Sequence, residues 1–159
     1  MATDFLLEIA GIKGESSDSA HKETIEIESF SWGCSNAGAH SLGGGGGAGK
    51  VSFQDIHFTT TVNKASPTLM MSCAQGKHIE KAVLFVRKQG EKQQDYYIIT
   101  LKDLLVSGYQ SADSSGGSLP TDQFSLNFSE IKFEYKPQKA DGTLAGAVTG
   151  TWNLKTNKP

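Results

Sequence analysis

The sequence is poor in the features that define several functional classes. It has only two cysteines in 159 residues, Cys34 and Cys73, which favours free thiols over a disulfide. No apolar run approaches the ~20 residues that span a bilayer, so we expect no membrane insertion. Lysine and arginine (15) nearly balance aspartate and glutamate (17) and form no basic block, which argues against a nucleic-acid partner.

The N-terminal segment lacks the pattern of a secretory signal peptide. Asp4 and Glu8 occupy positions where a signal peptide carries a cationic start and an unbroken apolar run. The sequence therefore predicts a protein that is made and folded in the cytoplasm.

Residue groupings that carry catalysis or bind cofactors are missing as well. No second ligand at metal spacing accompanies any of the four histidines, which are His21, His40, His57 and His78. No serine lies in a Gly-x-Ser-x-Gly elbow, and no general acid–base pair or cofactor motif stands out. We therefore predict no catalytic, cofactor-binding or metal-binding residues, and a protein that is not an enzyme.

What the sequence does contain is a series of short apolar segments separated by glycine, serine, asparagine and aspartate. This rhythm is typical of an antiparallel barrel or sandwich, and the length suggests a single domain over residues 1–159. We expect strands in the segments Phe5–Ile9, Glu23–Gly33, Lys50–Asn63, Ala82–Val86, Tyr96–Leu101, Phe124–Tyr135 and Val148–Leu154.

Three of these segments shift the phase of their apolar alternation by one residue. In the second segment, for example, Ile25 and Ile27 are followed by Phe30 and Trp32. Because side chains in a strand alternate faces, such a slip moves the apolar set to the other face. The slips predict long strands that bulge or bend, which is how a sheet curls toward closure.

One helix is expected, beginning at Ser66 and ended by Gly76. Ser66 would cap its N-terminus and Pro67 would occupy the first helical position. Ten or so residues are marginal alone in water, so the helix should pack against a sheet. Its apolar stripe comprises Leu69, Met70 and Cys73.

A turn and a loop are expected between the central strands. The polar turn Gly90–Gln94 should join two strands into a hairpin, and Leu104–Tyr109 continues the second arm or starts a further strand. Gln110–Asp122 is expected to be a loop rich in serine and glycine.

Five consecutive glycines, Gly43–Gly47, followed by Ala48-Gly49-Lys50, form the most unusual local pattern. Gly44 to Lys50 fits G-x-x-x-x-G-K, the phosphate-binding loop of nucleotide-binding proteins. However, Val51 follows where a magnesium-binding Ser or Thr is required, and the next residues favour a strand over a helix. A long loop between two strands is the better interpretation, and loops of this length tend to be functional.

Several segments together resemble the hemolysin-coregulated protein (Hcp) family, whose members form the inner tube of the bacterial type VI secretion system. The matching segments are Gly11–Ser16, Trp32–Gly33, His40–Lys50, Ala65–Met71, Gly76–His78 and Tyr135–Gly142. The resemblance extends over essentially the whole chain, and the motifs are specific only when taken together.

This resemblance implies a mainly β fold in which two curved antiparallel sheets form a β-barrel with one short α-helix at the side. It further implies homo-hexameric rings that stack into a hollow tube, driven by sheath proteins behind a spike protein of the VgrG type. The subunits would leave the bacterial cytoplasm through the type VI system without a signal peptide, and effector proteins could travel in the lumen.

The family's extended loop, which reaches the adjoining ring, corresponds to about residues 35–49 here. The residues expected in ring stacking are Ser35, Asn36, His40, Leu42, Gly43, Gly44, Gly45, Gly46, Gly47 and Lys50. Ser31 lies opposite Phe30 and Trp32 in the expected strand alternation, and we expect it to face the lumen and contact effectors.

Two other functional classes remain open on sequence alone. The first is a monomeric β-barrel that binds a small ligand or a protein, which would have a single-subunit mass in solution. The second is a nucleotide-binding enzyme, in which Lys50→Ala would abolish nucleotide binding.

Overall fold

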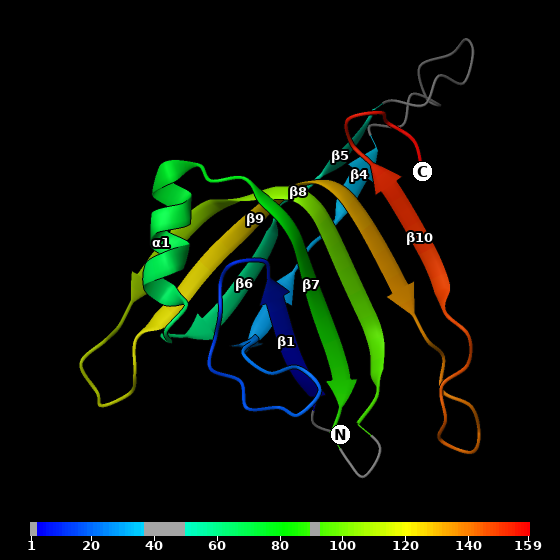
Figure 1. Cartoon of the computed structure of the whole chain (residues 1–159), viewed down its shortest axis with the longest axis horizontal. Coiled ribbons are helices and arrows are strands. Elements are labelled where there is room, and N and C mark those ends of the chain that lie inside the picture. The colour runs from blue at the N-terminus through cyan, green and yellow to red at the C-terminus, as the bar shows by residue number, and fades with distance from the viewer. Residues whose placement is uncertain (1–2, 37–49, 90–92) are drawn as a thin grey trace.

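The computed structural model describes residues 3–36, 50–89 and 93–159. Strands dominate, and the helix α1, Ser66–Gln75, lies at the side of the curved sheet (Figure 1). The strands are β1 Thr3–Ile9, β2 Ile25–Ile27, β3 Ser29–Ser31, β4 Cys34–Asn36, β5 Val51–Phe53, β6 Ile56–Thr61, β7 Ile79–Lys88, β8 Asp95–Ala112, β9 Thr121–Tyr135 and β10 Val148–Asn153.

The main sheet curls into a barrel. Its antiparallel strands follow the order β2-β1-β7-β8-β9-β6-β3, and β10 adds to β9. The two ends of this order meet because β2 and β3 flank one residue, Glu28, whose backbone N–H donates to the Thr59 carbonyl of β6 at 2.8 Å. The expected class, a mainly β barrel with one helix at its side, is confirmed. Strands β4 and β5 form a separate two-stranded ladder.

Each predicted phase slip coincides with a bend or a distortion of the sheet. The first slip falls at Glu28 between β2 and β3, and the second falls in the break between β5 and β6. In the late segment β9 continues as one strand, and its partner β8 is distorted instead. The register of β8 against β9 shifts between Val106 and Gly108, and Asp103 in β8 has φ 53°.

The barrel interior is filled by apolar side chains from nearly every strand. Alternate residues of each strand point inward, so the core draws on strands far apart in the sequence. The largest side chains that are almost completely buried are Phe58, Leu7, Ile25, Ile56, Leu69, Leu84, Ile99, Leu101, Leu126 and Val106. Aromatic rings from the two sides of the barrel meet at the edge of this core, as where Trp32 Nε1 donates to the Tyr97 hydroxyl at 2.7 Å.

The helix forms where expected, but its cap and its buried face differ from the prediction. Ala65 is the N-cap and makes no side-chain cap bond, so Ser66 is the first helical residue. The Ser66 hydroxyl is buried and donates instead to the Asp122 carboxylate of β9. Met70 is 49% exposed and not part of the packed stripe, because the helix is turned to bury Ser66, Leu69 and Ser72.

The hairpin of central strands is confirmed by the pairing of β7 with β8. Most of its predicted turn, residues 90–92, lies outside the described residues. The second arm continues without interruption through Leu104–Tyr109. The predicted loop Gln110–Asp122 is shorter than expected, because β8 extends to Ala112 and Asp122 is a buried residue of β9.

Candidate assembly interface

One exterior face of the barrel, the polar face, is lined mainly by small polar side chains, and Asp55 at its margin accepts hydrogen bonds from Ser107 and Asn127. It is formed where β3, β6, β8 and the first half of β9 lie side by side. The outward-pointing residues of this face are Ser29, Ser31, His57, Thr59, Gln110 and Gln123, and Ser125 lies on the same side but is buried. Ser31 is exposed, opposite the half-buried Phe30, as the alternation predicted. The sequence did not predict the other residues of this face, because only strand pairing brings them together.

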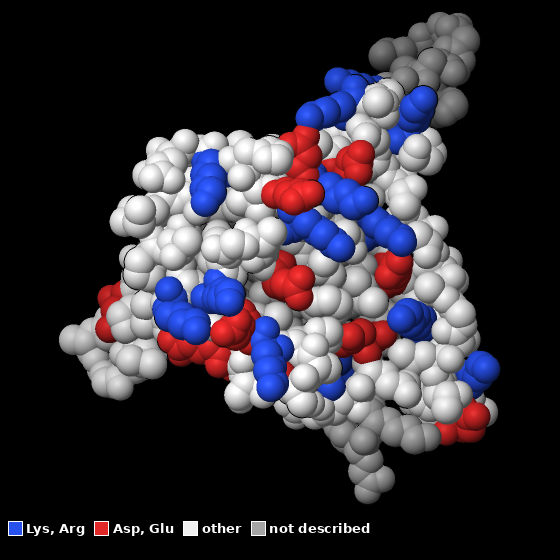
Figure 2. All heavy atoms as spheres, in the orientation of Figure 1, with Lys and Arg blue, Asp and Glu red and all other residues white. Residues whose placement is uncertain are grey.

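The face on the other side of the barrel is strongly charged. Figure 2 shows lysines and acidic residues interspersed over β7, β8 and β9. The outward positions there include Glu8, Lys81, Lys102, Glu130, Lys132 and Glu134. The two exterior faces therefore differ in chemistry, and the barrel can present one to a narrow interior space and the other to solvent or a charged partner.

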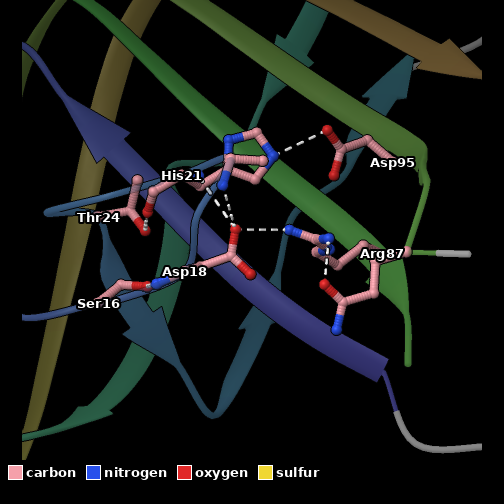
Figure 3. A network of polar contacts seen from close by, with 8 residues as sticks. Ser16, Asp18, His21, Thr24, Arg87 and Asp95 are labelled. Atoms are coloured by element: carbon pink, nitrogen blue, oxygen red, sulfur yellow. Dashed lines mark hydrogen bonds and ion pairs between the residues drawn. The ribbon is translucent and has the colours of Figure 1, made fainter. Parts of the chain in front are cut away.

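The segment between β1 and β2 folds over the lower part of this charged face and is held there by a polar network (Figure 3). Asp18 Oδ1 binds Arg87 Nη1 at 2.8 Å, and the Arg87 side chain is only 5% exposed. His21 Nε2 lies 2.8 Å from Asp95 Oδ2, and the His21 ring stacks on Phe85. Because Arg87 is charged and almost buried, the network fixes this segment firmly to the barrel.

This environment lowers the pKa of the Asp18 carboxylate. Partial burial raises its pKa, but the N–H groups of Ala20 and His21 and the Arg87 guanidinium outweigh burial, so the pKa lies below 3.8. Asp18 therefore remains ionised at neutral pH and keeps its ion pair with Arg87.

Strands β4 and β5 form an arm that projects from one end of the barrel (Figure 1). Ser35 pairs with Ser52 and Asn36 pairs with Val51. The predicted stacking loop therefore begins in a strand: Ser35 and Asn36 belong to the ladder and not to a loop. Lys50 is exposed directly before β5. The other expected stacking residues, His40, Leu42 and Gly43–Gly47, lie outside the described residues.

The arm also bears on the nucleotide-binding alternative. The glycine run leads through Lys50 into strand β5, as the sequence predicted. A phosphate-binding loop depends on the N–H groups of a helix that begins at this point, and no helix does. The geometry therefore disfavours nucleotide binding.

Strand β10 lies at an edge of the main sheet, paired with β9 and with no second strand partner among the described residues. Val148 is 66% exposed and pairs with Tyr135, which is 45% exposed. On the opposite side of the barrel, α1 presents Met70 and Met71, the latter 52% exposed (Figure 1). Two exposed apolar surfaces therefore lie on opposite sides of the molecule.

The end of the chain is fastened to the barrel by the carboxylate of Asp103. His78 Nε2 and Lys155 Nζ both bind it, at the point where Asp103 adopts its left-handed conformation in β8. Hydrogen bonds from Lys155, from His78 and from Ser129 hold the pKa of Asp103 at about 2. This cluster joins the segment after α1, β8 and the residues that follow β10.

Over residues 3–36, 50–89 and 93–159, no group of three metal-ligating side chains comes together. Both cysteines are free thiols, with Cys34 exposed and Cys73 half-buried. No helix of the described chain is long and apolar enough to cross a membrane.

The chain is similar to known proteins over nearly all of its length. It matches the model of a family described as "Type VI secretion system effector, Hcp" over residues 6–135. Protein hcp1 of Pseudomonas aeruginosa is 46% identical over 159 residues, which cover 99% of this chain and 98% of that protein.

Solved structures agree with these sequence matches. A type six secretion system protein superposes with a TM-score of 0.93 at 29% identity, with 99% of each chain covered. Hcp1 from Salmonella typhimurium superposes with a TM-score of 0.79 at 34% identity, again with 99% of each chain covered.

Proposed function

The chain belongs to the Hcp family of type VI secretion system effectors, and we propose that it is the structural subunit of that system's inner tube. Six copies close into a ring, and rings stack into a hollow tube. The observation that best supports this proposal is the contrast between the two exterior faces of the barrel. A tube wall needs an inner surface that does not trap cargo and an outer surface that meets other partners.

Ring closure requires two different surfaces that fit each other. A head-to-tail contact between identical copies closes into a ring when the rotation allows. The edge of β10, which pairs with no further strand of the described residues, and the exposed Val148 lie on one side of the barrel, and Met70 and Met71 of α1 lie on the other. We assign the side-to-side contact to these two surfaces, because exposed sheet edges and large apolar side chains favour association.

The polar face lines the lumen in this arrangement. Ser31 lies on β3 in that face, and its small hydroxyl leaves room for an effector protein carried in the tube. The charged face then points outward, toward the sheath proteins. Rings stack through the arm of β4 and β5, a spike protein of the VgrG type closes the tip, and the subunits are secreted through the same system.

No enzymatic step belongs to this function, and the Hcp family is not a known enzyme family. The packed interior of the barrel also gives no support to the alternative of a monomeric module that binds a small ligand inside the barrel.

Electron microscopy of the purified protein tests the proposal. We expect closed rings of six subunits with an open centre, and short stacks of rings at high protein concentration. Images that contain only single compact particles would reject the tube and favour the monomeric alternative.

A further inference from the structure

A groove of ≈ 390 Å³ opens on the charged face, which we call the basic groove. Its floor is the outer surface of β8, β9 and β10, and one wall is the segment that follows β10. That segment turns back over the end of β10. The Asn153 N–H donates to the Lys158 carbonyl at 2.8 Å, and the Lys158 N–H donates to the Asn153 carbonyl at 3.3 Å.

Two rows of outward-pointing side chains cross the strands at the groove. The first row consists of Lys81, just outside the groove, followed by Lys102, Glu130 and Asn153. The second row consists of Thr100, Lys132 and Thr151. Lysines are therefore concentrated in this part of the charged face, where several blue side chains lie close together in Figure 2.

The first row contains a pair of like charges. Lys81 on β7 lies directly opposite Lys102 on β8, and such pairs, about 5 Å apart at Cβ, destabilise a sheet. Neither lysine forms an ion pair among the described residues, and neither does Lys158 in the wall of the groove. An unfavourable local pair of this kind is expected at functional positions. These three ammonium groups are therefore available to a partner.

The acidic residues at the groove already have donors of their own. Glu130 Oε1 accepts from Asn153 Nδ2 at 2.6 Å, and Glu134 Oε1 lies 2.8 Å from Lys132 Nζ. The Lys132 side chain is still 48% exposed. Three threonines also line the groove. The groove thus offers ammonium and hydroxyl donors, which suit carboxylate groups.

The spacing of the lysines favours an extended protein segment. Lys102 pairs with Glu130, so Lys102 and Lys132 are diagonal neighbours about 7–8 Å apart. Residues i and i+2 of an extended chain are about 7 Å apart and point the same way. Acidic side chains at alternate positions of one segment can therefore meet both lysines.

A nucleic acid fits this surface less well than a peptide. Glu130 lines the groove and Glu134 lies beside it, and both repel a continuous row of phosphates. A peptide carries its charges singly and can place neutral residues against these glutamates.

We propose that the basic groove binds an extended acidic segment of a partner protein. This inference rests on the proposed function and deepens it, because the groove lies on the face that we assign to the outside of the ring. Exposed ion pairs each contribute little and are screened by salt, so one groove should bind weakly. The grooves of a ring act together, so a partner that repeats the segment should bind a ring more tightly than a single subunit.

A synthetic peptide tests the groove directly. The probe is a short fluorescent peptide in which glutamate alternates with serine, and its binding to the purified protein is followed by fluorescence anisotropy at low ionic strength. We expect Lys102→Gln combined with Lys132→Gln to raise the dissociation constant about fivefold, since two exposed ion pairs are lost. Lys136→Gln combined with Lys139→Gln removes the same charge outside the groove and should bind as the wild type does.

Further measurements separate the groove from a general attraction between charges. The same peptide with glutamine in place of glutamate should not bind, and single-stranded DNA of equal charge should bind more weakly than the acidic peptide. Thr151→Asp places a carboxylate opposite Lys132, so it should weaken peptide binding while rings remain intact.

The outcomes distinguish this inference from the proposed function. Equal affinities of the two double variants for the acidic peptide would overturn the groove, and so would tighter binding of the DNA. Rings that form but bind no peptide would reject the groove and leave the tube function in place. A protein that binds the peptide only as single subunits would support the groove and reject the tube function.

Discussion

At the scale of single residues, the structure uses several side chains differently from what local patterns indicate. Ser66 has the sequence context of an N-cap, yet its hydroxyl joins the start of α1 to Asp122 on β9. The two residues are 56 positions apart, so no local pattern could reveal the bond. Ser31 was predictable, because its exposure follows from simple alternation along one strand.

Substitution of Ser31 tests the lumen at this scale. Ser31→Gln should leave rings intact but reduce the amount of co-expressed effector protein that copurifies, because a longer side chain on the polar face narrows the channel. Glu8→Gln, on the charged face, should leave that amount unchanged. Rings of Ser31→Gln that carry as much effector as the wild type would show that Ser31 does not face the cargo.

The Asp103 cluster gives a prediction about pH. A carboxyl whose folded pKa is about 2, below its ordinary 3.8, contributes stability that is present above about pH 4 and is lost as pH falls toward 2. Asp103→Asn keeps the left-handed backbone, which asparagine tolerates, but removes the titration. In urea unfolding, the wild type should therefore be the more stable of the two at pH 5, and the difference should shrink between pH 4 and pH 2. A difference that is constant with pH would contradict this account.

At the scale of elements, the apolar pattern identified every main strand and the helix, because these elements bury a periodic face. It could not assign the last phase slip to the right strand, since β8 carries the bulge while β9 stays continuous. The end of β8 was also missed, because residues Gln110–Ala112 are polar and owe their strand conformation to pairing with β9. The polar segment between β1 and β2 has no apolar periodicity from which its position could be predicted. It is held over the charged face by the ion pair between Asp18 and Arg87.

That segment depends on one glycine where two backbones approach closely. A Cβ on Gly14 would lie 2.4 Å from the Thr24 carbonyl oxygen, so the backbone would have to move. We expect Gly14→Ala to lower the free energy of unfolding by about 2 kcal/mol, as overpacked sites do. Gly146→Ala is the matched control, because no atom of the described residues lies within 4 Å of its added methyl group. Equal unfolding midpoints for the two variants would refute the close approach.

At the scale of the whole molecule, the barrel presents a different chemistry on each side. A polar face, a charged face, an arm of β4 and β5 at one end, and exposed apolar surfaces on two opposite sides are what the proposed ring requires. The sequence resemblance predicted the ring and the tube, but not where these surfaces lie. They become visible only when strands distant in sequence are paired.

The side-to-side contact can be tested through β10. Val148→Asp should raise the subunit concentration that is needed for ring formation by at least about tenfold, because it places a charge on an exposed apolar surface. Thr151→Asp, on the opposite face of the same strand and paired with Lys132, should leave ring formation unchanged. Neither variant should alter the unfolding of the subunit. Unchanged rings for Val148→Asp would remove β10 from the contact.

The central claim is that copies of this chain close into a ring of six. Its most direct test is the molar mass of the purified protein in solution, measured by light scattering over a wide range of concentrations. The account predicts a species six times the mass of the 17.0 kDa chain, present even in dilute samples, with multiples of it at high concentration. A mass that remains that of one chain at every concentration would contradict it.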